Sequence, residues 1–188
     1  MIVCAGNNET FPFATAIGVG LIESAMNLTR MALFDKPEYL IFIGSAGSYG
    51  KYKPFDIVES SIGSNIELSF LDNNSYTPID NVIEAYKDEK NVSRGTIATS
   101  KDIVNSSNYI TTNMELAQKY RKYGVELENM EFFSVLKIAQ EFEIPLHGIF
   151  VITNYCDKEA HDMFLTNHEK AKALLSVYML DKYKDLKR

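Results

Sequence analysis

Two stretches of the chain, residues 39–43 and 146–153, are apolar at almost every position. Short continuous apolar runs are typical of strands that are buried on both faces, as in a sheet covered by helices on each side. We therefore expect both stretches to lie at the centre of a sheet. A shorter apolar run at residues 2–5 predicts another strand, and the glycine-punctuated run at residues 14–20 predicts a strand that leads into a helix.

Apolar residues recur at helical spacing in other parts of the chain. The pattern is clearest between Leu21 and Phe34, and Pro37 would stop that helix from continuing. The same spacing predicts further helices at residues 113–123, from Glu131 to Phe142, and at about residues 164–183, with a short amphipathic helix at residues 79–87.

Shorter runs with strand character occupy residues 55–58, 64–70 and 93–99. Strands and helices thus alternate along the chain, which is typical of α/β proteins. We predict an α/β fold, a three-layer sandwich in which helices flank a central mixed β-sheet. We find no linker, repeat or low-complexity tract, so we expect a single domain that spans residues 1–188.

Charge and hydrophobicity exclude several classes of partner. The formal net charge is −6 and the pI is about 5.1, so the chain does not suit a nucleic-acid backbone. No apolar run reaches the length needed to cross a membrane. The first residues lack the basic segment of a signal peptide.

Cysteine and histidine usage bears on compartment and cofactor. Cys4 and Cys156 both lie in apolar runs and make no disulfide framework, so we expect buried free thiols in a cytoplasmic protein. The three histidines have no metal-ligand spacing with the cysteines. We expect neither a metal nor a cofactor, because a dinucleotide-binding motif is also missing.

Three predicted strands end in small or polar residues, at residues 44–47, 99–102 and 153–154. In open α/β sheets, ligands bind outside the carboxyl ends of the strands. Gly44 and Gly47 would let a ligand approach the backbone closely. Taken singly, each of these segments is explained as well by an ordinary turn, and no Walker motif is present.

The acidic stretch before the helix at Glu131 has two interpretations. A carboxylate at a helix N-terminus is stabilised by the helix dipole and the free N–H groups, so Glu131 could simply cap the helix. Alternatively, Met130 and Glu131 line a pocket, one as an apolar wall and the other as a double hydrogen-bond acceptor. This stretch alone does not decide between the two.

The order of these segments resembles the purine nucleoside phosphorylase and nucleosidase superfamily, and especially its short methylthioadenosine nucleosidase-like and futalosine hydrolase-like branches. The resemblance extends over about residues 14 to 180 and rests on Gly18-Val-Gly before a helix, Gly44-Ser-Ala-Gly after a strand, Asn129-Met-Glu, and Thr153-Asn154 after a strand. It implies an enzyme that cleaves the N-glycosidic bond of a purine nucleoside.

The resemblance also implies roles for individual residues. Glu131 matches the glutamate that accepts hydrogen bonds from the ribose hydroxyls, and Met130 matches the methionine that packs on the sugar. Asn129 stands where many nucleosidases carry a glutamate. The remaining matches concern the base and the anomeric carbon, and they are Ser45, Ala46, Gly47, Val104, Thr153, Asn154 and Phe164.

Asn154 is the most informative departure from the adenine-cleaving nucleosidases, which have an aspartate there. An asparagine amide offers one donor and one acceptor group and cannot act as a general acid. It suits the face of a 6-oxopurine, which presents acceptors at O6 and N7 and a donor at N1. The resemblance therefore implies a 6-oxopurine nucleoside as the substrate.

The acceptor of the ribosyl group is less clear. The primary hypothesis is phosphorolysis to the free base and ribose 1-phosphate, with phosphate as co-substrate. The family's bacterial phosphorylases carry an arginine where Phe42 and Ile43 stand here, which favours water instead, although Lys101 could supply charge. Hydrolysis would need a base, and Glu9 is the carboxylate nearest to the family's catalytic glutamate.

Two further possibilities stay open. The chain could bind a nucleoside without turnover, because its N-terminal segment is shorter than in relatives. The motifs could also occur by chance in an unrelated α/β fold, and then Ser45, Glu131 and Asn154 would not meet in one pocket. The resemblance further implies a homo-oligomer, as a dimer, trimer or hexamer, whose small-molecule partner is a nucleoside.

Overall fold

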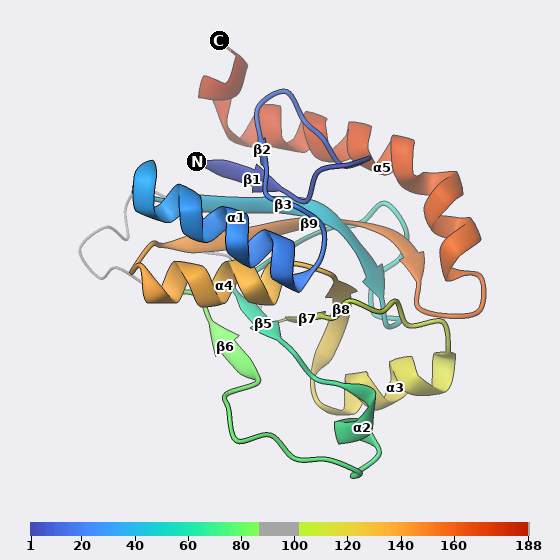
Figure 1. Ribbon diagram of the computed structural model, residues 1–188. Coiled ribbons are helices and arrows are strands. Elements are labelled where there is room, and N and C mark those ends of the chain that lie inside the picture. Colours follow the sequence, from blue (N-terminus) through green and yellow to red (C-terminus); the bar gives the residue numbers. More distant parts are fainter. Residues whose placement is uncertain (87–101, 188) are drawn as a thin grey trace.

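A computed structural model describes residues 1–86 and 102–187 of the chain. The predicted strand at residues 93–99 and the residue Lys101 lie outside these ranges. Within them, the prediction of a mixed sheet flanked by helices is confirmed (Figure 1). The fold is the three-layer α/β arrangement that the alternating pattern indicates.

The central strand of the sheet is β3 (Leu40–Ser48), which has three neighbours. It pairs in parallel with β9 (Leu146–Tyr155) along its whole length on one side, and residues 41–43 pair in parallel with β1 (Ile2–Cys4) on the other. Its last two residues also pair with β8 (Val125–Asn129), which runs antiparallel to it. The remaining strands are β2 (Thr15–Ala16), β4 (Ile57–Ser60), β5 (Ile62–Ser64), β6 (Val82–Glu84) and β7 (Ile103–Ser106).

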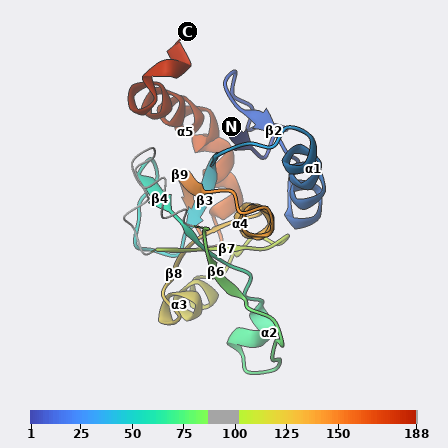
Figure 2. The same cartoon turned by 90° about the vertical axis from the view of Figure 1, so that its left-hand side faces the viewer.

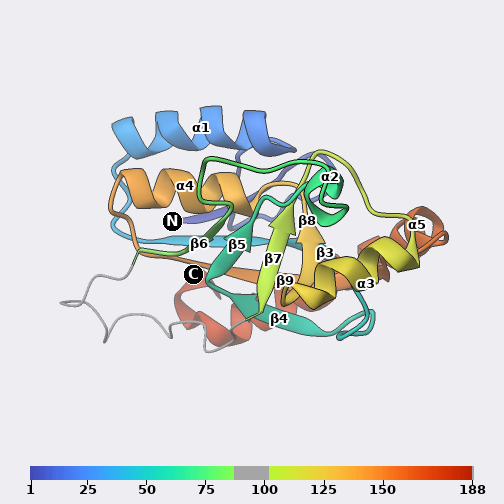
Figure 3. The same cartoon turned by 90° about the horizontal axis from the view of Figure 1, so that it is seen from below.

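Helices cover both faces of the β1–β3–β9 region (Figures 1 and 3). The helices α1 (Leu21–Phe34) and α4 (Phe132–Glu141) pack on one face, and α5 (Ala160–Lys182) packs on the other. The shorter helix α3 (Met114–Lys122) packs beside β8, and α2 (Leu68–Leu71) contacts α3 farther from β8 (Figure 2). The chain ends in a 3-10 helix at Lys184–Lys187.

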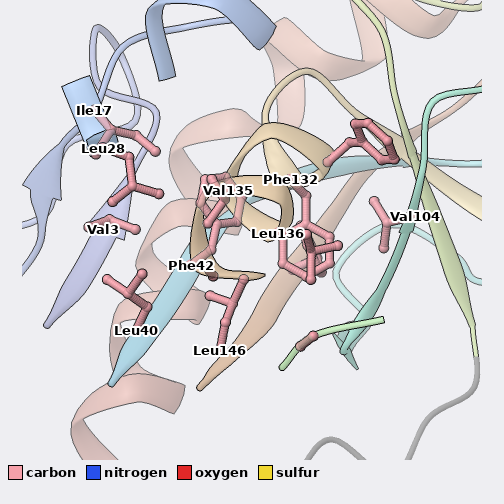
Figure 4. Packing of buried hydrophobic residues seen from close by; sticks show 14 of the residues in the cluster. Val3, Ile17, Leu28, Leu40, Phe42, Val104, Phe132, Val135, Leu136 and Leu146 are labelled. Carbon is pink, nitrogen blue, oxygen red and sulfur yellow. The ribbon is translucent and has the colours of Figure 1, made fainter. Parts of the chain in front are cut away.

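The larger hydrophobic core lies between the sheet on one side and the helices α1 and α4 on the other (Figure 4). Its centre is formed by Phe42, Phe132 and Phe150, whose ring centroids are 5.0 to 5.8 Å apart. A Cβ at Gly148 would lie 2.6 Å from Phe150 and 2.7 Å from Phe132, so only glycine admits both rings there. This packing fixes α4 against the strands whose carboxyl ends carry the polar motifs.

Several local predictions were wrong. Residues 44–48 do not form a turn, because β3 continues through Ser48 and its glycines stay in the sheet. Residues 64–70 form the end of β5 followed by α2 instead of one strand, and residues 82–84 form β6 instead of a helix. The strands β7 and β8 were not expected. The short strands owe their conformation to pairing with neighbouring strands and not to a long periodic pattern.

The register of β3 and β9 shifts where the polar residues begin. Ala46 lies opposite Ile152, but Gly47 lies opposite Asn154, so Thr153 is an extra residue in β9. Such bulges re-aim side chains next to functional sites. Within the described ranges, no helix has both the length and the apolar character needed to cross a membrane.

Candidate active site

A cavity of about 290 Å³ opens at the carboxyl ends of β3, β8 and β9. Most of the residues predicted to form the site line this cavity, although they come from distant parts of the sequence. They are Glu9, Ser45, Ala46, Gly47, Asn129, Met130, Glu131, Thr153, Asn154 and Phe164. Because Ser45, Glu131 and Asn154 meet in one cavity, the possibility of chance motifs in an unrelated fold is excluded.

Glu131 stands at the first position before α4, but its side chain does not cap that helix. One carboxylate oxygen accepts from the backbone N–H of Gly20 at 2.9 Å, and the other accepts from the N–H of Met130 at 3.2 Å. The side chain is only 5% exposed and lines the cavity. The pKa of Glu131 is raised to about 7, chiefly by burial and also by the nearby Glu9 carboxylate, while the hydrogen bonds from Gly20 and Met130 lower it.

Asn129 performs the capping function that Glu131 leaves vacant. Its Oδ1 accepts from the N–H of Phe132 at 3.2 Å and from the hydroxyl of Ser106 at 2.7 Å. The Ser106 hydroxyl in turn accepts from the N–H of Phe133. The first free N–H groups of α4 are therefore satisfied by these two side chains. The Asn129 Nδ2 also donates to Glu131 at 3.3 Å, so one amide both caps the helix and orients the carboxylate.

Glu9 also lines the cavity. Its carboxylate accepts from the backbone N–H of Ser45 at 3.1 Å and from the Ser45 hydroxyl. A Cβ at Gly44 would lie 3.1 Å from Glu9 Oε2, so the glycine makes room for this carboxylate. Burial raises the pKa of Glu9, while its hydrogen bonds with Ser45 act in the opposite direction.

The phosphorylase superfamily matches residues 2–181, which is nearly the whole chain. This chain belongs to the phosphorylase superfamily. No curated protein matches it in sequence. The family assignment therefore rests on the family-wide pattern together with the fold.

Solved structures with the same fold include several nucleosidases. A Helicobacter pylori methylthioadenosine nucleosidase variant is 18% identical, with a TM-score of 0.80 and coverage of 98% of this chain and 97% of the other. Futalosine hydrolase of Helicobacter pylori is 18% identical, with a TM-score of 0.78 and 96% coverage of each chain. The Neisseria meningitidis nucleosidase is 14% identical, with a TM-score of 0.73 and coverage of 93% and 94%.

In this phosphorylase-superfamily fold, Asn154 of β9 lies opposite Gly47 of the neighbouring strand β3. Its amide is 6% exposed; it accepts from the Thr153 hydroxyl at 2.8 Å and donates to the carbonyl of Tyr155 at 3.0 Å. A Cβ at Gly47 would lie 3.2 Å from Asn154 Nδ2 and 2.8 Å from the Cys156 sulfur. The missing side chain at Gly47 thus leaves the amide accessible from the cavity.

Met130 and Phe164 provide apolar walls on two sides of the cavity. Phe164 comes from the first turns of α5, and its ring centroid is 4.9 Å from that of His168. Val104 does not belong to this wall. It is fully buried in β7 among the core residues of α4 (Figure 4), so the prediction that it contacts the base was wrong.

The cavity lining also contains residues that sequence reasoning did not assign to the site, among them Tyr109, Ile110, Glu128 and His161. Glu128 is 7% exposed and accepts from the Tyr49 hydroxyl at 2.7 Å and from the Thr111 N–H at 2.9 Å. The alternation of Val125, Glu126, Leu127 and Glu128 was a strand signal that could have placed Glu128 beside β3.

The acidic side chains of the cavity lining are not balanced by basic ones of the lysine or arginine type among the described residues. Three glutamates, Glu9, Glu128 and Glu131, face the cavity, and no described residue that lines it is a lysine or an arginine. Burial raises the pKa of all three carboxyl groups. The cavity can therefore accept hydrogen bonds from a polyhydroxylated ligand and can take up a proton near neutral pH, but it offers little to a dianion.

Proposed function

We propose that this chain hydrolyses the N-glycosidic bond of a purine nucleoside whose base is a 6-oxopurine. The observation that carries the proposal is the meeting of Glu9, Glu131 and Asn154 in one cavity. Each of the three supplies a different requirement of the reaction: a base for water, an anchor for the sugar and a hydrogen-bonding partner for the leaving group.

Glu131 would hold the sugar. Cleavage of the bond builds positive charge on the ribose, and an ionised carboxylate both accepts from the ribose hydroxyls and tolerates that charge. Gly20 donates to one oxygen of the carboxylate, and Met130 and Asn129 both donate to the other, so the oxygen bound by Gly20 keeps a lone pair for a ligand. The Met130 side chain beside it supplies an apolar contact for the sugar.

Asn154 would stabilise the base as it leaves. The electron pair of the broken C–N bond moves onto the purine, where an amide donor can stabilise the developing negative charge. An amide that donates to O6 and accepts from N1–H fits a 6-oxopurine. An asparagine can also donate to N7 of adenine and accept from its 6-amino group, but it cannot protonate N7 as that base leaves.

Glu9 would activate the attacking water. Its raised pKa makes the carboxylate a stronger base, and Ser45 holds it at the cavity wall. The water oxygen bonds to the anomeric carbon, Glu9 accepts the proton, and the proton can then pass to the departing base. The reaction uses only water and the chain's own side chains.

Two observations favour water over phosphate, which was the primary hypothesis from the sequence. A phosphate dianion would face Glu9, Glu128 and Glu131 without a lysine or arginine among the described residues of the lining. The similar structures carry the names of hydrolytic enzymes, a methylthioadenosine nucleosidase and a futalosine hydrolase. One of them holds 5′-methylthioadenosine in its active site.

The test is a comparison of inosine, guanosine, adenosine and futalosine, each with and without phosphate, in which the free base is measured by chromatography. We expect base release from 6-oxopurine nucleosides without phosphate, and its loss in Glu9→Gln. Release that requires phosphate would establish phosphorolysis instead. If no nucleoside is cleaved while hypoxanthine or inosine still binds in calorimetry, the chain is a nucleoside-binding protein without turnover.

A further inference from the structure

The segment that carries Glu9 is a tight turn with little support of its own. The chain reverses within residues 6–9, where the N–H of Glu9 donates to the carbonyl of Gly6 at 2.9 Å. Gly6 and Asn7 both have positive φ, 100° and 52°. Asn7, Asn8 and Thr10 are exposed around the partly buried Glu9, so the turn buries few side chains that could fix its position.

The helix α5 holds this turn by a backbone atom. The carbonyl oxygen of Asn8 accepts from His168 Nε2 at 3.0 Å and from Lys172 Nζ at 3.2 Å. The two side chains are four residues apart and therefore lie on the same face of the helix. A carbonyl oxygen has two lone pairs, so these two donors satisfy it fully. Because a carbonyl can only accept, the His168 Nε2 carries a proton in this contact.

These contacts act directly on the position of Glu9. The peptide unit that joins Asn8 to Glu9 is planar, and both of its ends are hydrogen-bonded, the N–H to Gly6 and the carbonyl to α5. Fixing this plane fixes the Cα of Glu9 and the direction in which its side chain leaves the backbone. At the other end, Ser45 holds the carboxylate. Glu9 is thus tethered at both ends.

The helix α5 also closes the space behind Glu9. Glu9 and Ser45 line a second, separate void of about 10 Å³, whose other walls include His168 and Lys172. A void of this size admits about one water molecule. The Glu9 carboxylate consequently lies between the reaction cavity in front and α5 behind it, where little room is left for another rotamer.

Charge acts in the same direction as geometry. His168 and Lys172 lower the pKa of Glu9, against the larger effect of burial, which raises it. The other ionisable groups that interact with Glu9 are Glu131 at the start of α4 and the Cys4 thiol in β1. The two α5 side chains therefore favour the ionised form of the carboxylate, which is the form able to accept a proton from water.

We infer that His168 and Lys172 are positioning residues for Glu9, which hold the water-activating carboxylate in place from behind by clamping the Asn8 carbonyl. This inference rests on the proposed hydrolysis. In this chain, where only a few residues separate the first strand from Ala14, the clamp gives the catalytic turn the rigidity that its own short sequence does not provide.

The test compares four variants of the full chain. His168→Leu removes the donor, whereas His168→Gln keeps a donor near the position of Nε2. Lys172→Met removes the second donor and its charge. Lys170→Met is the matched control, because Lys170 lies on the same helix but faces the Phe55 ring, 4.2 Å from its centroid. The measurements are kcat, KM, the pH profile and amide hydrogen exchange of residues 5–12.

We expect His168→Leu to lower kcat about tenfold with KM nearly unchanged, because small misplacement of a catalytic group costs rate more than binding. His168→Gln should restore most of kcat. Lys172→Met should lower kcat and move the acidic limb of the profile to higher pH. Exchange of residues 5–12 should rise in His168→Leu and Lys172→Met only. Lys170→Met should match the wild type in every measurement.

Wild-type kcat in both His168→Leu and Lys172→Met would overturn the inference. So would an equal loss in His168→Leu and His168→Gln with unchanged exchange, since that pattern indicates a general packing role. If the wild type releases no base, the proposed function fails on its own. Amide hydrogen exchange of residues 5–12 then tests the clamp by itself. Faster exchange in His168→Leu that His168→Gln restores to the wild-type rate supports the clamp, and unchanged exchange overturns it.

Discussion

Glu131, the proposed anchor of the sugar, has an unusual ionisation state. The side chain is almost fully buried, and its pKa lies at about 7, although three N–H donors surround it. Desolvation therefore outweighs hydrogen bonding at this residue. If Glu131 holds the sugar as proposed, a carboxyl group that titrates near neutrality makes the affinity for the sugar depend on pH in the physiological range.

The first prediction concerns this titration. Because the proposed sugar contact requires the ionised carboxylate, kcat/KM should rise with pH through about 7 and level off above it. Glu9 also has a raised pKa and is also proposed to act in its ionised form. The rise of kcat/KM with pH therefore reports the coupled titration of Glu9 and Glu131. Glu131→Gln should lower kcat/KM on the order of 10²-fold or more. A wild-type profile that is flat between pH 5 and pH 8 would contradict this assignment.

The second prediction concerns the choice of base. Asn154→Asp would replace an amide donor with a group that accepts from a 6-amino substituent when ionised and donates to N7 when protonated. The ratio of kcat/KM for adenosine to that for inosine should rise at least about tenfold. Asn108→Asp is a suitable control, since Asn108 lies outside the cavity lining and its Oδ1 would still accept from the N–H of Leu21. The same ratio in wild type and Asn154→Asp would show that Asn154 does not read the base.

At the scale of elements, the start of α4 shows how a cap can be displaced to free a functional group. The residue at the capping position, Glu131, turns toward the cavity, and Asn129 and Ser106 satisfy the helix N–H groups instead. Asn129 is the last residue of β8 and Ser106 is the last residue of β7, and the two lie opposite each other in the paired strands. The junction between sheet and helix is thus fixed by side chains that also surround the site.

The third prediction tests this junction against an ordinary cap. Asn129→Ala should lower the free energy of unfolding by about 1–2 kcal/mol, because it leaves the N–H of Phe132 unsatisfied. It should also lower kcat/KM, since Glu131 loses a donor. The control is Asn113, which caps α3 and whose Oδ1 accepts from two N–H groups of that helix. Asn113→Ala should lower the free energy of unfolding by about 1 kcal/mol. Denaturant titrations and assays of both variants check this. Equal kcat/KM in the two variants would contradict the proposed second role of Asn129.

The elements with a long apolar pattern were predictable from sequence, and the short ones were not. The helix at Leu21–Phe34 and the strands around residues 39–43 and 146–153 were expected because periodicity or continuous burial shows in the sequence itself. The strands β7 and β8 have four or five residues and depend on each other and on β3 for hydrogen bonds. Such pairing is non-local, so the residues of one short strand carry little of its signal.

The site was predictable where a motif lies next to a strong element. Glu131, Asn154 and the Ser45 segment adjoin long strands or a long helix, and all three line the cavity as expected. Glu9 was expected only as the nearest carboxylate, and its hydrogen bonds with Ser45 follow from a turn geometry that the sequence does not show. Glu128 and the contact of His168 with Asn8 were missed, because pairing of β8 with β3 and packing of α5 create them.

At the scale of the whole molecule, the surface carries large apolar side chains that the fold leaves uncovered. On α1, Ile22, Met26 and Phe34 are 69%, 67% and 79% exposed. Exposed apolar groups of this size on one helix are typical of association surfaces. The fourth prediction is therefore the homo-oligomer that the family resemblance implies. Light scattering should give a mass that is a multiple of 21.3 kDa. The mass of one chain, unchanged well above micromolar concentration, would contradict it.

The fifth prediction follows from the cost of burying an ionised carboxylate. The pKa of Glu131 is about 7 in the folded chain, against 4.5 for the ordinary glutamate of an unfolded chain. Between these values the folded state holds a proton that the unfolded state has released. The free energy of unfolding must therefore fall as the pH rises from about 4.5 to about 7, by up to about 3 kcal/mol from this residue.

Glu131→Gln removes this contribution, so its stability should decline less than that of the wild type between pH 5 and pH 8. Urea titrations at both pH values give the difference, and comparing slopes with pH cancels any fixed cost of the substitution itself. Parallel declines in wild type and variant would mean that Glu131 is already ionised at low pH. The predicted outcome means that the site is kept at the expense of stability, because the carboxylate proposed to anchor the sugar is the one that destabilises the fold at neutral pH.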